Sequence, residues 1–138
     1  MTISCVRFKS SVVLDPMTPT LARLLCAVDM TARMMGVDLT VSCGREGHGP
    51  TDPHTLGAAL DISVFNLTPD LIVRSLNYMQ AGLGELFYMQ YEVPGTPVNG
   101  ALKNIAVINP QATAPHFHVQ AKKGTVYPPQ DSENGQQA

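Results

Sequence analysis

The four histidines of this 138-residue chain fall in two short segments that are far apart in the sequence. The first segment contains His48 and His54, and Asp61 follows His54 by seven positions. The second is the tripeptide His116-Phe117-His118. Two imidazoles and one carboxylate form a ligand set that leaves zinc an open fourth position for water. A fold that uses these residues together must bring both segments to one point.

The residues around the histidines permit such a site. Gly57 allows the chain to turn between His54 and Asp61, so both side chains can reach one ion. His116 and His118 are two positions apart on an expected strand and therefore point to the same face. A lone histidine is more often a surface or hydrogen-bonded residue than a ligand. By spacing alone, a metal site and scattered structural histidines both stay open.

Length and charge limit the classes of protein to consider. A chain of 138 residues with 44% hydrophobic residues is suited to one domain with one core. A net charge of −2 without a block of basic residues argues against binding to nucleic acid or anionic lipid. We expect no membrane span, because no apolar run is long enough. The first residues lack the pattern of a secretory signal, which predicts a cytoplasmic protein in the producing cell.

The three cysteines, Cys5, Cys26 and Cys43, form no Cys-x-x-Cys pair and are odd in number. This argues against a thiolate zinc cluster and against a disulfide framework. We expect reduced, buried side chains. Cys43 is near the expected site, but strand alternation predicts that it points into the core, which argues against a role as nucleophile.

Hydrophobic periodicity predicts two helices. The first has Thr18 as its N-cap and Pro19 at its first position, and it ends at Gly36. The second opens at Thr68-Pro69-Asp70 and ends around residues 82–84.

Strands are expected at residues 39–43, 58–64, 86–93, 103–109 and 117–120. Strands and helices do not alternate regularly, so we predict an α+β fold with an antiparallel sheet and flanking helices. The domain is expected to cover residues 1–121, and the tail at 122–138, rich in Pro, Gln and Gly, to be partly disordered.

The residues around the histidines also carry a family resemblance. The resemblance rests on one pattern, preceded by Ser42 and Arg45: His54-x-x-Gly57-x-Ala59-x-Asp61-Ile62, then His116-x-His118-Val119. This pattern resembles the zinc D-alanyl-D-alanine carboxypeptidases and related murein endopeptidases, which share the hedgehog/DD-peptidase fold. The resemblance runs from about residue 6 to residue 119. It looks closest to the compact lysins of bacteriophages and prophages.

The resemblance implies that Zn²⁺ is bound by His54, Asp61 and His118. It implies that His116 lies beside the metal, where it polarises water or steadies the charged intermediate. It also implies that Arg45 holds the substrate or the developing oxyanion, a task that suits a planar and permanently charged guanidinium. From sequence, His48 is either an outer partner of a ligand or, as we favour, a loop residue facing solvent.

The chain departs from the family pattern in two places. Pro53 and Thr55 flank His54, where many relatives have other residues. Some relatives carry a glutamate base three positions before the last ligand, and this chain has Pro115 there. The base is therefore His116, an acid from elsewhere, or no residue at all. The acids that we consider are Glu46, Asp52 and Glu92.

Three functions follow from these expectations. The first is a zinc metallopeptidase that cleaves peptidoglycan stem or cross-link peptides at the bacterial cell wall. As a lysin it would be virion-associated or would depend on a holin-type partner for access to the wall. The second is a non-catalytic zinc-binding module of the same fold, structural or virion-associated. The third is a cytoplasmic D-Ala-D-Ala dipeptidase.

Overall fold

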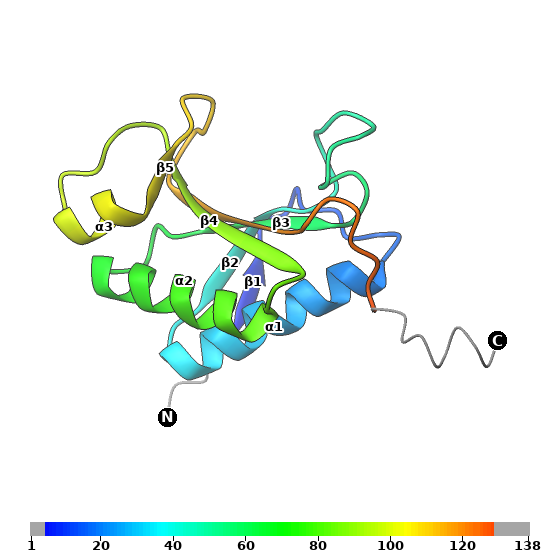
Figure 1. Ribbon diagram of the computed structural model, residues 1–138, viewed down its shortest axis with the longest axis horizontal. Coiled ribbons are helices and arrows are strands. Elements are labelled where there is room, and N and C mark those ends of the chain that lie inside the picture. The colour runs from blue at the N-terminus through cyan, green and yellow to red at the C-terminus, as the bar shows by residue number, and fades with distance from the viewer. Residues whose placement is uncertain (1–4, 129–138) are drawn as a thin grey trace.

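A computed structural model describes residues 5–128 of the chain. Their strands form one mixed sheet in the order β1-β2-β3-β6-β4-β5. Helices α1 and α2 cover one face of this sheet, and the loops around residues 44–53 and 109–115 rise from the other (Figure 1). The elements are β1 (Val6–Phe8), α1 (Pro19–Met35), β2 (Leu39–Cys43), β3 (Ala59–Ser63), α2 (Pro69–Leu83), β4 (Phe87–Val93), α3 (Gly100–Ile105), β5 (Ala106–Ile108) and β6 (His116–Ala121).

Both predicted helices are confirmed, with their caps. The hydroxyl of Thr18 accepts a hydrogen bond from the backbone N–H of Leu21 at the start of α1. Gly36 ends this helix in the left-handed conformation, at φ 68°, which glycine adopts without a steric penalty. Thr68 caps α2 in the same way through the N–H of Leu71.

The sheet has one apolar face and one polar face. On β6, Phe117 and Val119 are fully buried against the helices, whereas the alternate residues His116 and His118 are only partly buried. β3 and β4 repeat this alternation, with Leu60, Ile62, Phe87, Met89, Tyr91 and Val93 in the core. Because side chains alternate across a strand, packing against α1 and α2 directs the polar residues to the face that the helices leave open.

The sheet differs from the antiparallel one that the sequence predicts. Strands β2, β3, β6 and β4 pair antiparallel, but β1 pairs parallel with β2 and β5 pairs parallel with β4. The fold class is therefore α+β with a mixed sheet. β1 has only three residues, which is too short for an alternation to be visible in the sequence.

The strand predicted at 103–109 is largely wrong. Residues 100–105 form α3, and the strand β5 is limited to 106–108. The side chain of Asn99 accepts a hydrogen bond from the N–H of Leu102 and so starts a helical turn. α3 lies beside α2 at one end of the molecule (Figure 1).

The chain beyond β6 packs on the domain as far as it is described. The N–H of Lys122 donates to the carbonyl of Leu86, and the ring of Tyr127 lies 5.7 Å from that of Phe87. The first residues after Ala121 therefore contact the domain. The rest of the predicted tail, 129–138, lies outside the described residues.

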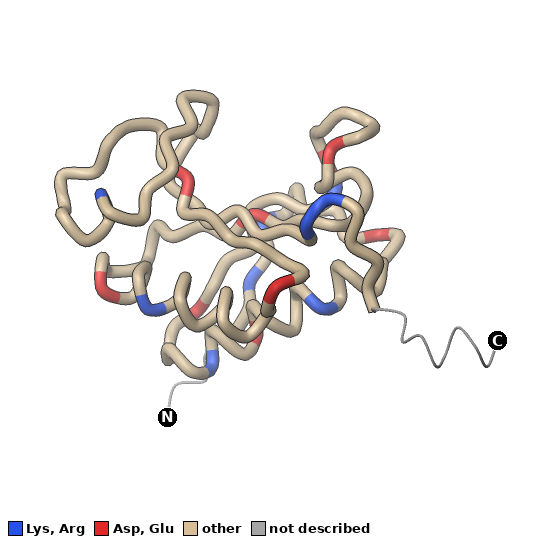
Figure 2. The backbone as a smooth tube through the Cα atoms, in the orientation of Figure 1, with Lys and Arg blue, Asp and Glu red and all other residues tan. Residues whose placement is uncertain are grey.

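Within residues 5–128, no helix combines the length and the apolar character needed to cross a membrane. Lys and Arg are spread over the helices and over the loops that connect the strands (Figure 2).

We expect the substitution Phe117→Ala to lower the free energy of unfolding by about 3–5 kcal/mol, because it empties a fully buried site at the centre of the sheet. Phe65→Ala is the matched control, since Phe65 is 79% exposed and its loss should change stability by less than about 0.5 kcal/mol. Denaturant titration of both variants measures the difference. Equal losses would contradict the assignment of the core.

Candidate metal centre

Three of the predicted site residues meet on the polar face of the sheet. Oδ1 of Asp61 lies 3.3 Å from Nε2 of His54 and 2.9 Å from Nδ1 of His118. One ligand atom from each of these residues lies within 4.8 Å of the others. Asp61 and His118 are opposite each other in the register of β3 and β6. The structure thus brings together residues that are 57 positions apart in sequence.

The remaining nitrogen of each imidazole has an oxygen partner. Nδ1 of His54 lies 3.1 Å from the backbone carbonyl of Gly44, and Nε2 of His118 lies 2.7 Å from Oε1 of Gln120. These acceptors bind the ring N–H and leave the opposite nitrogen free for a metal, which is how outer partners usually orient histidine ligands. Neither partner was identified from sequence. Gly44 contributes a backbone carbonyl, which depends on how the chain folds, whereas Gln120 follows His118 by two positions on the expected strand.

Without a metal ion, the carboxylate of Asp61 lies between the imidazoles of His54 and His118. Burial raises the pKa of Asp61, but hydrogen bonds from His118 and His54 outweigh the effect of burial. The pKa of this carboxyl group therefore lies well below its usual range. Burial opposes protonation of His118, but its hydrogen bonds to Asp61 and Gln120 raise its pKa above the ordinary value. Asp61 is therefore ionised and gives the site a fixed negative charge.

The donor set fits a zinc ion. Ligand atoms that are each about 2.0–2.2 Å from a tetrahedral zinc lie about 3.3–3.6 Å from one another. The separation of His54 Nε2 from Asp61 Oδ1 is in this range, and the hydrogen bond between His118 and Asp61 is slightly shorter. Two nitrogens and one carboxylate oxygen also suit manganese and cobalt, so the atoms fit a transition metal without selecting one.

A tight turn before β3 positions His54. The carboxylate of Asp52 accepts from the N–H of His54, and the carbonyl of Pro53 accepts from the N–H of Ala58. Gly57 has φ 70°, and a Cβ on it would lie 2.6 Å from Cγ2 of Thr18. The turn therefore requires glycine, as the sequence suggested.

Arg45 is not brought together with the metal ligands. Its guanidinium donates to the backbone carbonyls of Pro16 and Thr55, and Arg45 is not among the residues that line the cavity above the site. It ties the turn that carries His54 to the segment before α1. The geometry thus gives Arg45 a supporting position in this turn.

His116 lies beside the three ligands and is paired with a carboxylate. Its Nε2 is 3.1 Å from Oε1 of Glu92 and 4.0 Å from Oδ2 of Asp61, and its Nδ1 is 3.0 Å from the carbonyl of Ala114. Nδ2 of Asn109 donates to the same oxygen of Glu92 at 3.3 Å. Among the three acids considered from sequence, Glu92 is thus the one that contacts His116.

The other two acids have different partners. The carboxylate of Glu46 accepts from the backbone N–H groups of Val13 and Gly44. The carboxylate of Asp52 accepts from the N–H of His54, with a second oxygen 3.6 Å from Nδ1 of His48.

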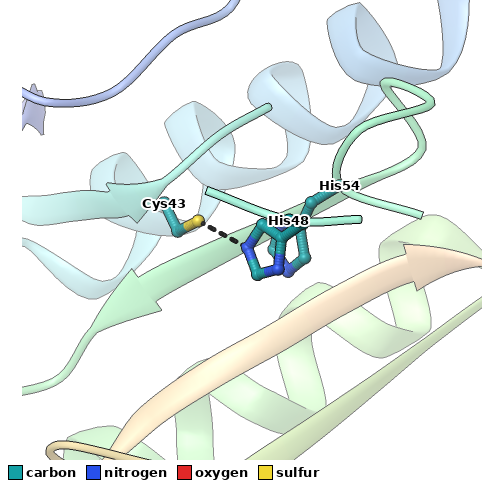
Figure 3. Close-up of side chains that lie close together, drawn as sticks. All are labelled: Cys43, His48 and His54. Carbon is teal, nitrogen blue, oxygen red and sulfur yellow. Dashed lines mark hydrogen bonds between the residues drawn. The ribbon is translucent and has the colours of Figure 1, made fainter. Parts of the chain in front are cut away.

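Cys43 and His48 lie close to His54. His48 is an exposed loop residue, as we favoured from the sequence, whereas Cys43 is only partly buried, contrary to its prediction. Sγ of Cys43 is 3.1 Å from Nε2 of His48, and the rings of His48 and His54 are stacked with centroids 4.3 Å apart (Figure 3). A register shift in β2 after Val41 interrupts the alternation that would have buried Cys43. All three cysteines are free as predicted, but they are not buried, and Cys26 is exposed.

An open cavity of about 390 Å³ lies over the site. Its floor is the polar face of β3 and β6, and the segment 111–115 forms part of its wall. Its charged lining residues are Lys9, Asp52, Asp61 and Glu92. The space is large enough for a short peptide, and its lining favours a cation.

No protein-family model, curated protein or solved structure matches the chain.

We expect Gly57→Ala to destabilise the protein by about 1–3 kcal/mol more than Gly36→Ala. Both glycines have a positive φ, but a Cβ at residue 36 meets nothing within 4 Å, so its substitution costs only the backbone strain of about 1–2 kcal/mol. Denaturant titration gives the two values, and zinc affinity should fall only for Gly57→Ala, since only that turn carries His54. Equal effects on both measurements would show that the turn does not position the ligand.

Proposed function

We propose that this chain is a zinc-dependent peptidase that cleaves stem or cross-link peptides of peptidoglycan. The observation that carries the proposal is the convergence of His54, Asp61 and His118 at the floor of an open cavity, with His116 and Glu92 beside them. Three protein ligands leave a position for water, as in hydrolytic zinc sites. The resemblance of the His54 and His116 segments to D-alanyl-D-alanine peptidases supports the substrate class and the hedgehog/DD-peptidase fold.

The ligands would be Nε2 of His54, a carboxylate oxygen of Asp61 and Nδ1 of His118. A zinc ion held there supplies a Lewis acid that acidifies water and polarises a peptide carbonyl. The carbonyl of Gly44 and the side chain of Gln120 keep the two imidazoles in the orientation that binding needs.

Glu92 and His116 are the groups that move protons in this proposal. Both ring nitrogens of His116 face oxygen acceptors, namely Glu92 and the carbonyl of Ala114. A ring held in this way is a proton donor. In this proposal Glu92 therefore takes the proton from water, His116 gives a proton to the leaving amine, and the proton on Glu92 then passes to His116. Asn109 fixes the carboxylate of Glu92 by donating to it. The pair thus provides the base that Pro115 cannot.

Lys9 and Arg45 have separate roles. Among residues 5–128, Lys9 is the one lysine or arginine that lines the cavity, and an ammonium group there suits a carboxylate of the substrate peptide. Arg45 acts as a positioning residue for the turn that carries His54, through its bonds to Pro16 and Thr55. Access to the wall would come from a virion or from a holin-type partner.

We expect the purified protein to bind about one zinc ion at this set and to release peptides from purified peptidoglycan. A chelator should abolish the release, and added zinc should restore it. Mass spectrometry of the products identifies the bond. Zinc binding without cleavage would favour a non-catalytic module, and cleavage of free D-Ala-D-Ala alone would favour a dipeptidase.

We expect Glu92→Gln to lower kcat about 10²–10⁴-fold with little change in bound zinc, because Glu92 is beside the ligand set and acts in proton transfer. Glu85→Gln, between α2 and β4 on the exposed surface, is the matched control and should keep full activity. Steady-state kinetics and metal analysis of both variants separate the two effects. Unchanged kcat in Glu92→Gln would exclude the Glu92–His116 pair as the base.

A further inference from the structure

A second group of possible metal ligands shares His54 with the first. One ligand atom each from Cys43, His48 and His54 lies within 4.8 Å of the others. Figure 3 shows the thiol of Cys43 directed at the His48 ring, which is stacked on His54. This group contains a sulfur and therefore differs in chemistry from the set of His54, Asp61 and His118.

The bulge in β2 and a carboxylate on the following loop create this group. The register shift after Val41 releases Cys43 from the core-facing alternation. Oδ2 of Asp52 is 3.6 Å from Nδ1 of His48, while Nε2 of the same ring is 3.1 Å from Sγ of Cys43. A carboxylate behind an imidazole is a usual outer partner of a metal-binding histidine.

We propose that Cys43, His48 and His54 form a second metal position, which takes a thiophilic cation such as zinc or a copper(I) ion. Thiolate sulfur and imidazole nitrogen are the ligands that such cations prefer. On binding, the S–H bond of Cys43 is replaced by a sulfur–metal bond and the thiol proton goes to solvent.

The negative charges around Cys43 disfavour a thiolate without a metal ion and attract a cation. Burial, together with the carboxylates of Glu46, Asp61 and Asp52, raises the pKa of the Cys43 thiol to about 12. Without a metal the thiol therefore keeps its proton. The same carboxylates attract a cation, so a bound metal ion compensates the charge that opposes the thiolate.

The second position is an alternative to the first because both use His54. Nδ1 of His54 faces the carbonyl of Gly44, which leaves Nε2 as the free ligand atom for either set. A cation held by Cys43 and His48 therefore withdraws His54 from Asp61 and His118. This inference concerns metal binding alone, and it does not depend on peptidase activity.

Cobalt(II) tests the proposal, since a cobalt–thiolate bond gives an intense charge-transfer absorption in the near ultraviolet that nitrogen and oxygen ligands do not give. The metal-free full-length protein is titrated with Co²⁺ in a reductant that does not bind metals. We expect the thiolate band in the unaltered protein and its loss in Cys43→Ser and in His48→Gln. Cys26→Ser, which removes an exposed cysteine of α1, is the matched control and should keep the band.

The variant His118→Ala separates the two positions. It removes a ligand of the first set and leaves Cys43, His48 and His54 in place, so the thiolate band should be more intense at saturating Co²⁺ than in the unaltered protein. Far-ultraviolet circular dichroism checks that every variant is folded. If folded His118→Ala binds Co²⁺ without a thiolate band, or if the band persists in folded Cys43→Ser, the second position does not exist.

Discussion

The antiparallel pairing of β3 with β6 is the constraint on which the rest of the site depends. It sets Asp61 opposite His118 and Leu60 opposite Val119. Because Leu60 and Val119 are fully buried, a slip of one residue would place the charged pair in the core and the apolar pair in solvent. The hydrophobic contacts with α1 and α2 therefore fix the geometry of the ligands on the opposite face.

The same face accumulates negative charge that the metal-free chain balances only in part. Asp61 is held ionised by two imidazoles, and the cavity also contains the carboxylates of Asp52 and Glu92. Grouped acids in a partly enclosed space raise the local concentration of cations. The two groups of possible metal ligands share His54 and lie in this negative environment. Under our proposal, the thiol of Cys43 gives the second group its preference for thiophilic cations.

Much of this arrangement follows from local sequence, and the remainder depends on tertiary contacts. Thr18 and Gly36 predict the ends of α1 because caps act within a few residues. The spacing of His54 and Asp61 predicts that they can meet. The role of Gly44 could not be predicted, because a backbone carbonyl carries no signal in the sequence. Gln120 was missed, although it follows His118 by two positions on the expected strand and strand alternation places both residues on one face. The bulge at Cys43 was also missed, because Leu39, Val41 and Cys43 alternate with polar residues as in a regular strand.

The position of Glu92 in the sheet shows how a carboxylate can lie near the ligands although this chain has Pro115 where some relatives of the resembled family carry a glutamate. In the register of β4 and β6, Glu92 is directly opposite His116, and residues opposite each other on one face of a sheet have Cβ atoms about 4.5–5.5 Å apart. A carboxylate on a paired strand is held more rigidly than one on the loop before β6, where Pro115 stands. A carboxylate can therefore reach the space beside the ligands from the neighbouring strand, with His116 between it and Asp61. The proline then restricts the backbone that leads into His116. In the proposed mechanism, the acid that handles the proton is supplied by β4.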